Sequence, residues 1–432
     1  MEIEKIIFSI LAEFSRALHV KFFKEMGELT PMVDPVLSFA ISIALLIGLL
    51  VMKQEVHIAV LVSTISFGIL TLGISFLEST FKGIFSRSTL SLVTAFSSAL
   101  FLSYMMKVSG ILDRITDFAV SLGPRFASIF IPILIGLIPM PGGALVSAMM
   151  MKEHYMERQK LDSDFATFIN YWFRHVTIPV WPVFQSIIIA SVILKTSVVR
   201  IIEATYPAAI ASYVAGFLIF ALGIRKYENS FERGNVSYRA LVNLWPFLLI
   251  IALIFLIKLP VDISLLISAI LVTIYTRPSR KEVREGLKFA LSFKILAVVI
   301  AVTMFTQYVY DSKAALALYN FMLARNIPAL PLCFLITFII GVTTAGEYVY
   351  TGTAFPLLSE IIGTSSNIKD IFLLMSYTGG YLGVMLSPVH LCLVLTLEYY
   401  KARYSGVYKY LVPAVVISLV LTFLLSLLGS IV

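Results

Sequence analysis

Apolar residues run through this chain in long blocks that short polar segments separate. Pro35–Met52 and Leu411–Val432 are two such blocks, and neither contains a charged residue. Because a helix rises about 1.5 Å per residue, about 20 residues cross the ~30 Å hydrocarbon core of a bilayer. The blocks lack the short polar–apolar alternation of outer-membrane strands. The pattern therefore predicts an all-α polytopic membrane protein.

The blocks also form two similar sets, which predicts an internal repeat. The second set follows the first at a shift of about 205 residues, and Gly136 then pairs with Gly341 and Trp181-Pro182 with Ser387-Pro388. Chance alignment of hydropathy peaks is the alternative interpretation. The expected membrane elements are 36–52, 57–77, 88–106, 126–152, 165–194 and 199–222, then 241–259, 262–276, 295–310, 330–358, 371–397 and 407–431.

The fourth element of each set contains residues that interrupt a helix. Pro139, Pro141, Gly142 and Gly143 lie in the middle of the first, and Thr343–Glu347 holds the same place in the second. Proline removes a backbone donor and glycine relaxes the backbone, and such a break at membrane depth is tolerated only inside protein or beside a wet cavity. We expect re-entrant hairpins at 126–152 and 330–358, with a single kinked span as the alternative.

The fifth element of each set is long and broken, by Pro179 and Pro182 in the first half and by glycines and Ser387-Pro388 in the second. If the hairpins do not cross, each half crosses five times and the second half is inverted. The expected architecture is about ten transmembrane helices plus two hairpins in an inverted repeat, an arrangement typical of secondary transporters. Its parts are 1–34 (an amphipathic N-terminal helix), 35–223 (first repeat), 224–240 (a cytoplasmic linker) and 241–432 (second repeat).

Composition agrees with a membrane protein. Hydrophobic residues make up 59% of the chain and charged residues 13%, with a mean hydropathy of +0.94. The net charge of +8 comes from Lys and Arg in the loops between spans, so it implies no nucleic-acid partner. The predicted topology places most of the 33 basic residues on one face. That face should be cytoplasmic, which puts both termini outside the inner (plasma) membrane. Met1–Glu28 shows no signal-peptide pattern.

Three stretches resemble a known family: GLIPMPGGALVSAMM (Gly136–Met150), FINYWFRHVTIPVWPVFQ (Phe168–Gln185) and LSPVHLCLVLTLEYY (Leu386–Tyr400). They are similar to an uncharacterised prokaryotic family of ten-span membrane proteins related to the gluconate permeases, within the ion transporter superfamily. The resemblance implies cation-coupled transport of an anion, often by elevator motion in a homodimer. The Ser-Asn-Thr clamps of the superfamily's dicarboxylate carriers are absent from both hairpin tips, which argues against a dicarboxylate substrate.

Two charges are expected inside the membrane. Arg174 follows Thr167 and Asn170 and precedes Thr177 on one helical face, and its guanidinium could pair with a carboxylate. The alternative is a structural arginine. Glu347 directly follows the second tip and could carry a proton, coordinate a cation or pair with Arg174.

The tips offer further ligands for an anion or for Na⁺. Backbone amides and carbonyls at the glycines, together with nearby hydroxyls, could face either ion. Close helix packing is the alternative interpretation for the glycines, and above all for the row Gly379-x₃-Gly383-x₃-Ser387. The remaining expected substrate-binding residues are Gly142, Gly143, Ser147, Asn170, Thr177, Thr343, Thr344, Gly346 and Thr351.

His175 and His390 lie beside the proline breaks and could relay protons, although a lone histidine is more often a satisfied core residue. Cys333 and Cys392 lie in apolar runs and suggest small core residues, so no metal site or disulfide is expected. The chain lacks the common hydrolase, phosphate-loop and metalloprotease motifs, so no catalytic residue and no cofactor beyond a coupling ion is expected.

The sequence thus predicts a secondary transporter that moves a small organic anion, such as a sugar acid, with H⁺ or Na⁺. The lipid bilayer and a second copy of the chain are its expected partners. A cation–proton antiporter that uses Glu347 is the first alternative, and a non-transporting scaffold or receptor is the second.

Overall fold

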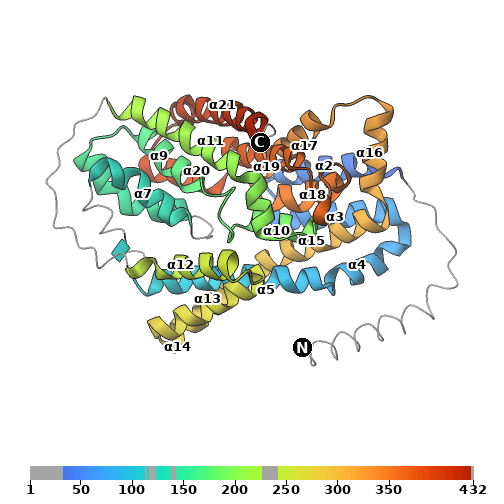
Figure 1. The fold of residues 1–432 in the computed structure, drawn as a ribbon, viewed down its shortest axis with the longest axis horizontal. Helices are drawn as coiled ribbons and strands as arrows, with labels where there is room; N and C mark the ends of the chain where they lie inside the picture. Colours follow the sequence, from blue (N-terminus) through green and yellow to red (C-terminus); the bar gives the residue numbers. More distant parts are fainter. Residues whose placement is uncertain (1–32, 112–113, 116–122, 138–142, 226–241, 430–432) are drawn as a thin grey trace.

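The computed structural model describes residues 33–111, 114–115, 123–137, 143–225 and 242–429. Within these ranges the regular structure is helical, so the all-α polytopic fold is confirmed (Figure 1). The first half contains α2 (Pro35–Val51), α3 (Val56–Leu72), α4 (Phe76–Ile84), α5 (Arg87–Val108), α7 (Pro124–Gly136), α8 (Gly143–Lys152), α9 (Ser163–His175), α10 (Gln185–Ile193) and α11 (Val198–Ile224).

The second half begins after residue 241. It contains α12 (Trp245–Ile251), α13 (Val261–Thr276), α14 (Arg280–Ala290), α15 (Phe293–Asp311), α16 (Ala314–Ala324), α17 (Ala329–Thr344), α18 (Glu347–Ile362), α19 (Asp370–Leu386), α20 (Leu391–Tyr400) and α21 (Tyr404–Gly429). Short π-helical turns extend α8 to Arg158 and α12 to Leu256.

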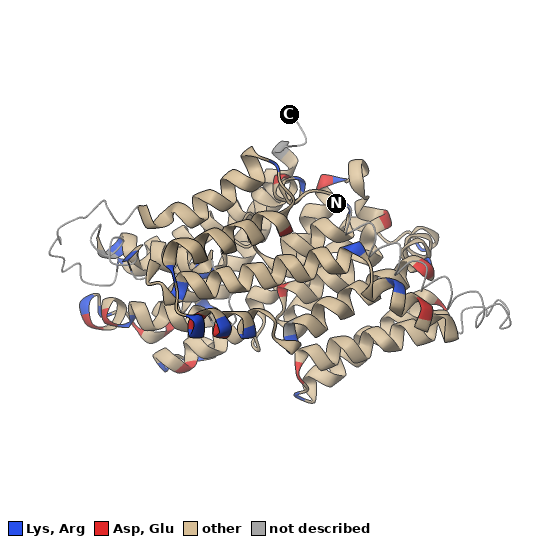
Figure 2. Ribbon diagram, turned by 90° about the horizontal axis from the view of Figure 1, so that it is seen from below, with Lys and Arg blue, Asp and Glu red and all other residues tan. Residues whose placement is uncertain are grey.

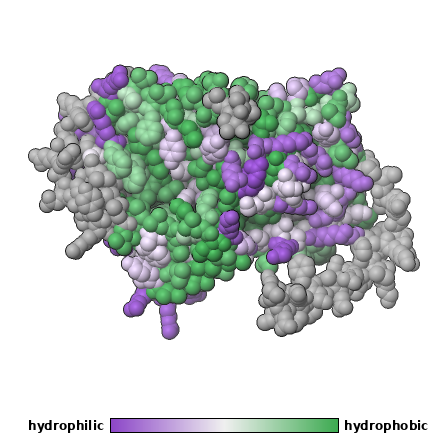
Figure 3. Space-filling model, viewed as in Figure 1, coloured by the Kyte–Doolittle hydropathy of each residue, from purple (hydrophilic) through white to green (hydrophobic). Residues whose placement is uncertain are grey.

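Several helices have the length and composition of membrane spans. Among the described residues five helical stretches qualify: Val56–Ile84, Arg87–Val108, Val198–Ile224, Asp370–Tyr400 and Tyr404–Leu427. Long stretches of ribbon carry no Lys, Arg, Asp or Glu (Figure 2), and apolar side chains cover much of the surface (Figure 3). The chain is therefore a multi-pass membrane protein. The number of crossings and the re-entry of the hairpins stay predictions.

The order of helices in the second half repeats that of the first. Three pairs of helices begin about 205 residues apart: α3 and α13, α7 and α17, and α11 and α21. Both helices of the last pair carry an internal proline, Pro207 in α11 and Pro413 in α21. Contacts between the halves are reciprocal as well. α8 packs on α20 while α18 packs on α10, and α3 packs on α15 while α13 packs on α5. The expected repeat stays a prediction, and these reciprocal contacts are compatible with it.

The contacts divide most helices into two groups that interleave the halves (Figure 1). The frame group consists of α2–α5 and α12–α15, where α5 packs on α13 and α14 and α15 packs on α3 and α4. The core group consists of α7–α11 and α17–α21, where α17 packs on α19, α11 on α21 and α20 on α9. The groups meet where α15 contacts α18 and where α5 contacts α10.

Small residues set the close packing of α17 on α19. A Cβ added to Gly379 or Gly383 would lie 2.3 Å from Phe334 O or 2.4 Å from Phe338 O, and the Ser387 hydroxyl donates to Val342 O at 2.6 Å. Between membrane helices van der Waals contact and small residues drive association. The packing role expected for this row is therefore confirmed.

Two helices of the second half, α14 and α16, lie outside the expected segments. α14 is rich in Lys, Arg and Glu, so hydropathy alone does not reveal it, and a capping box of Ser279 and Glu282 starts it. The hydrogen bonds from Ser279 lower the pKa of the exposed Glu282 carboxyl. Most of the expected N-terminal helix 1–34, the tip of the first hairpin and residues 226–240 of the expected linker lie outside the described residues, and Ile224 of that linker belongs to α11.

Gly341→Ala tests the packing of α17 on α19. The added methyl would lie 2.4 Å from Gly380 O and 3.0 Å from Val384 N, so the helices must separate. We expect a loss of about 1–3 kcal/mol in stability, measured as a lower midpoint of thermal unfolding in detergent. Gly48→Ala in α2 is the matched control because no atom lies within 4 Å of the added carbon. Equal midpoints for both variants would contradict the packing account.

Candidate functional site

A cavity of about 420 Å³ opens between the frame group and the core group. Its volume lies in the usual range for small-molecule sites. The frame group contributes residues of α3, α5 and α15, and the core group contributes the ends of α9, α10, α18 and α20. The lining residues are Glu55, Val56, His57, Phe96, Arg174, His175, Phe184, Gln185, Lys294, Val298, Ala345, Gly346, Glu347, Tyr348, His390, Leu391 and Cys392.

Three helix N-termini converge on this cavity. α10 begins at Gln185, α18 at Glu347 and α20 at Leu391, and each of these first residues lines the cavity together with its N-cap residue. The first turns of a helix leave backbone N–H groups without intrahelical partners and carry the positive end of the helix dipole. Their convergence makes the wall of the cavity favourable for an anion.

Arg174 enters the cavity from the last turn of α9. Its side chain is only 3% exposed, and the helix ends one residue later, where Pro179 and Pro182 follow in a series of turns. Gly136 holds this end in place because a Cβ there would lie 2.1 Å from Arg174 O. The repeat-related Gly341 packs in the same way on Gly380 O of α19. The glycine pair expected from the repeat therefore supports both broken helices.

Glu347 is the first residue of α18 and lines the same cavity. An acidic side chain in the first helical turn is favoured by the helix dipole. In the part of the chain that the structure describes, no salt bridge within 4.0 Å joins Glu347 to a basic residue. Within that part, the structure therefore shows Arg174 and Glu347 on one cavity without an ion pair between them.

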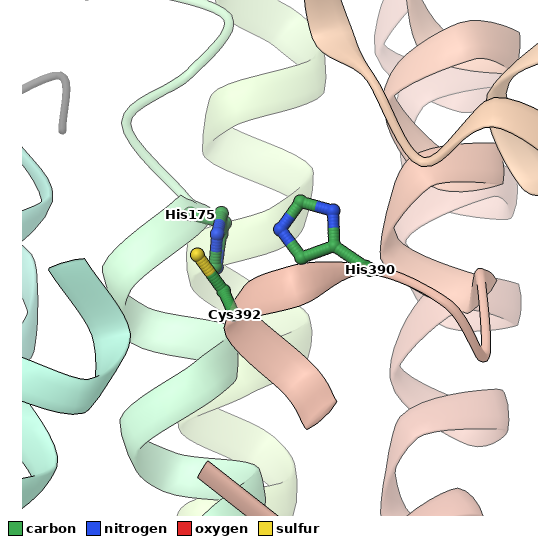
Figure 4. Close-up of side chains that lie close together, drawn as sticks. All are labelled: His175, His390 and Cys392. Atoms are coloured by element: carbon green, nitrogen blue, oxygen red, sulfur yellow. The ribbon is translucent and has the colours of Figure 1, made fainter. Parts of the chain in front are cut away.

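His175, His390 and Cys392 form a buried cluster on the cavity wall (Figure 4). His175 ends α9, His390 is the N-cap residue of α20, and Cys392 lies in the first turn of α20. The two imidazole ring centres are 5.1 Å apart and nearly perpendicular. The two helix breaks thus bring together groups that are more than 200 residues apart in sequence.

Two exposed charged residues of the frame group, Glu55 and Lys294, lie at the cavity rim. Lys294 at the start of α15 forms a salt bridge with Glu55, and His57 Nδ1 lies 3.3 Å from the same carboxylate. The hydrogen bond from Lys294 lowers the pKa of Glu55 from its usual value. The carboxylate therefore stays ionised at neutral pH. An exposed pair of this kind contributes little to stability, so its importance lies in the potential at the rim.

Five of the residues expected from the sequence line the cavity: Arg174, His175, Gly346, Glu347 and His390. Gly143, Ser147, Asn170, Thr177, Thr343, Thr344 and Thr351 are not among its lining residues, and Gly142 lies outside the described residues. The hydroxyls of Thr343, Thr344 and Thr351 donate to carbonyls one turn earlier in their own helices. The Asn170 amide donates to Ala144 O at 2.9 Å, which joins α9 to α8.

Sequence reasoning missed six polar or titratable lining residues: Glu55, His57, Gln185, Lys294, Tyr348 and Cys392. Gln185 and Cys392 belong to the first turns after the helix breaks, and the position of the breaks could have pointed to them. Glu55 and Lys294 come from the frame group, and nothing in their local sequence marks the cavity. Cys392 was expected to be a small core residue, and its place beside two histidines follows only from the tertiary structure.

Comparisons with known proteins identify a family but no curated relative. The family described as "Protein of unknown function (DUF401)" matches residues 35–429. No curated protein matches the chain. Among solved structures, the chain is similar to the YdaH transporter of Alcanivorax borkumensis, with a TM-score of 0.45 and 12% sequence identity over 91% of this chain and 99% of that chain. Kinship with gluconate permeases and the ion transporter superfamily stays a prediction.

Thiol labelling tests the cavity directly. Cys392 lines it, whereas Cys333 is buried in α17 away from it. We expect a small water-soluble maleimide to modify Cys392 in the Cys333→Ser variant and to leave Cys333 unmodified in the Cys392→Ser variant, as measured by intact mass. Faster labelling of Cys333 than of Cys392 would show that water does not reach the cavity.

Proposed function

The chain belongs to the DUF401 family of proteins of unknown function, and we propose that it is a secondary active transporter of a small organic anion, such as a sugar acid. The observation that carries the proposal is the set of three helix N-termini and Arg174 on one cavity. Broken helices whose N-termini meet at a substrate site are a hallmark of secondary transporters. A cavity of about 420 Å³ suits a molecule of this size.

Arg174 supplies the charge that selects an anion. A guanidinium buried at a helix break can donate two parallel hydrogen bonds to a carboxylate. The N–H groups that start α10, α18 and α20 add donors from other directions. An arginine inside a membrane protein is costly unless it faces a cavity or a partner, which supports a binding role at this position.

Coupling to H⁺ or Na⁺ is assigned to Glu347. Its carboxylate lines the anion cavity, so a cation bound there and the anion would stabilise each other. The C-terminal ends of α9 and α17, at His175 and Ala345, line the same cavity and carry the negative end of the helix dipole. His175 and His390 are the candidates for passing a proton to or from the cavity.

The motion proposed is an elevator movement of the core group against the frame group. The cavity lies between the two groups, and most of its polar residues belong to the core group. The reciprocal contacts between the halves support an inverted repeat with hairpins α7–α8 and α17–α18. In such a repeat the transporter reaches its second, oppositely open state when the two halves exchange conformations. A homodimer in the inner membrane, with both termini outside, completes this proposal.

A cation–proton antiporter is the alternative that one observation favours. Glu347 makes no described salt bridge, so it could exchange H⁺ for Na⁺ without an organic substrate. The convergence of helix N-termini favours the anion carrier instead. A non-transporting scaffold would have no need for broken helices around a cavity.

Arg174→Gln tests the anion site in proteoliposomes screened with sugar acids, hydroxy acids and amino acids under imposed H⁺ or Na⁺ gradients. We expect the wild type to accumulate an anion and the variant to bind it about 10- to 100-fold more weakly, as for loss of a charged hydrogen bond. Lys294→Gln at the rim is the matched control and should change affinity much less. Unchanged affinity in Arg174→Gln would remove Arg174 from the site.

Glu347→Gln tests coupling in the same vesicles. We expect anion exchange to continue while gradient-driven accumulation is lost, because an amide carries no titrating proton and binds Na⁺ more weakly. Glu55→Gln is the control because its carboxylate is held at the rim by Lys294. If Glu347→Gln kept the wild-type dependence on pH and on Na⁺, the coupling ion would have to bind elsewhere.

A further inference from the structure

The cluster of His175, His390 and Cys392 has the composition of a metal site. One nitrogen of each imidazole and the Cys392 Sγ all lie within 4.8 Å of one another. All three side chains are buried, with exposed fractions of 1%, 7% and 7%. Figure 4 shows the His175 ring beside the Cys392 sulfur, with the His390 ring facing both.

Backbone carbonyls fix both imidazoles in the form that binds a metal. His175 Nδ1 lies 2.6 Å from Tyr171 O, and His390 Nδ1 lies 3.0 Å from Ala345 O. A carbonyl oxygen only accepts, so each Nδ1 carries the hydrogen and each Nε2 of the neutral ring presents a lone pair. Metal-binding histidines nearly always donate their second N–H in this way.

The cluster contains more hydrogen-bond acceptors than donors unless a further group is bound. Neither Nε2 atom has a hydrogen-bond partner in the described part of the chain. The two nitrogens are acceptors, and the Cys392 thiol offers one weak S–H donor between them. At least one buried lone pair is therefore left unsatisfied, which is costly at this depth. A metal ion bound to a thiolate and two imidazoles would satisfy all three groups together.

We propose that His175 Nε2, His390 Nε2 and Cys392 Sγ bind a divalent transition metal of the zinc class, with a fourth coordination position open to the cavity. Two imidazoles and one thiolate suit zinc, whereas Na⁺, Mg²⁺ and Ca²⁺ prefer oxygen ligands. Zn–N bonds of about 2.0–2.1 Å and Zn–S bonds of about 2.3 Å place tetrahedral ligands roughly 3.3–3.6 Å apart. Side-chain rotations that bring the two Nε2 atoms and the Sγ atom about 1 Å closer together would give this geometry.

Charge on the cavity wall is consistent with a metal beside an anion. A divalent ion and a thiolate leave the cluster with one net positive charge, and Arg174 and Glu347 offset each other. The loaded cavity then attracts a carboxylate, which can fill the open coordination position. α9 and α20 both belong to the core group, so the bound metal joins the two halves without tying the core group to the frame group. The metal site does not depend on the proposed transport activity, and with the metal bound His175 and His390 would pass no proton, so that coupling would fall to Glu347 alone.

Cobalt titration of the purified full-length protein, carrying no histidine tag, tests the site. Co²⁺ is a spectroscopic substitute for Zn²⁺, and a thiolate ligand gives it a ligand-to-metal charge-transfer band. We expect the wild type to bind one Co²⁺ with this band and to release it to Zn²⁺. Cys392→Ser should lose the band, and His175→Gln and His390→Gln should each weaken binding by at least about 10-fold.

Two matched variants control this experiment. Cys333→Ser removes the other cysteine of the chain, and His57→Gln removes a histidine that lines the same cavity outside the cluster. Both should retain the band and the affinity. Absence of the band in the wild type, or its persistence in Cys392→Ser, would overturn the proposal. Equal loss of the band in Cys333→Ser would also overturn it.

A second measurement needs no change to the proposed ligands. Zn²⁺ should protect Cys392 from maleimide in the Cys333→Ser variant, while Mg²⁺ and Na⁺ at the same concentration should not. Chelation by EDTA should restore labelling. Labelling at the same rate with and without Zn²⁺ would overturn the proposal independently of whether the substituted variants fold.

Discussion

The need to satisfy every backbone polar group in a membrane controls this structure. In hydrocarbon an unpaired N–H or C=O group costs several kcal/mol, so a helix can stop at membrane depth only where protein or water meets its ends. Three described helices, α10, α18 and α20, start in the interior of the protein after a break. Their first turns line one cavity, so the same constraint that makes the breaks costly also concentrates donors at a single place.

Glycines let the broken helices hold their position. Gly136 allows α7 to contact the backbone at Arg174, and Gly341 allows α17 to contact the backbone at Gly380. A rigid support of this kind matters because Arg174 and His175 are the last residues of α9, where the backbone ladder ends. Packing of one helix against the end of another therefore sets the geometry of the charged residues that face the cavity.

The cavity combines groups that favour anions with groups whose lone pairs suit cations. Helix N-termini and Arg174 supply positive potential, while Glu347, two imidazoles and a thiol supply lone pairs. Opposite charges in a medium of low dielectric strengthen each other's binding, which is the physical basis for coupling one solute to another. The frame group adds a rim of exposed ions at Glu55 and Lys294.

The sequence by itself determined the helical fold, the position of most of the described helices and the breaks before α10, α18 and α20. It also pointed to Arg174, Glu347, His175 and His390, because charged or titratable residues are rare in apolar segments and conspicuous there. Only the tertiary structure decided which polar residues share a cavity. Helical periodicity predicted Asn170, Arg174 and Thr177 on one helical face, which is wrong for Thr177 because α9 ends at His175. Periodicity also does not say which neighbour covers a face, and α8 covers Asn170. The proximity of Cys392 to His175 could not be predicted from the sequence either, because it depends on how two breaks that are far apart in the chain pack together.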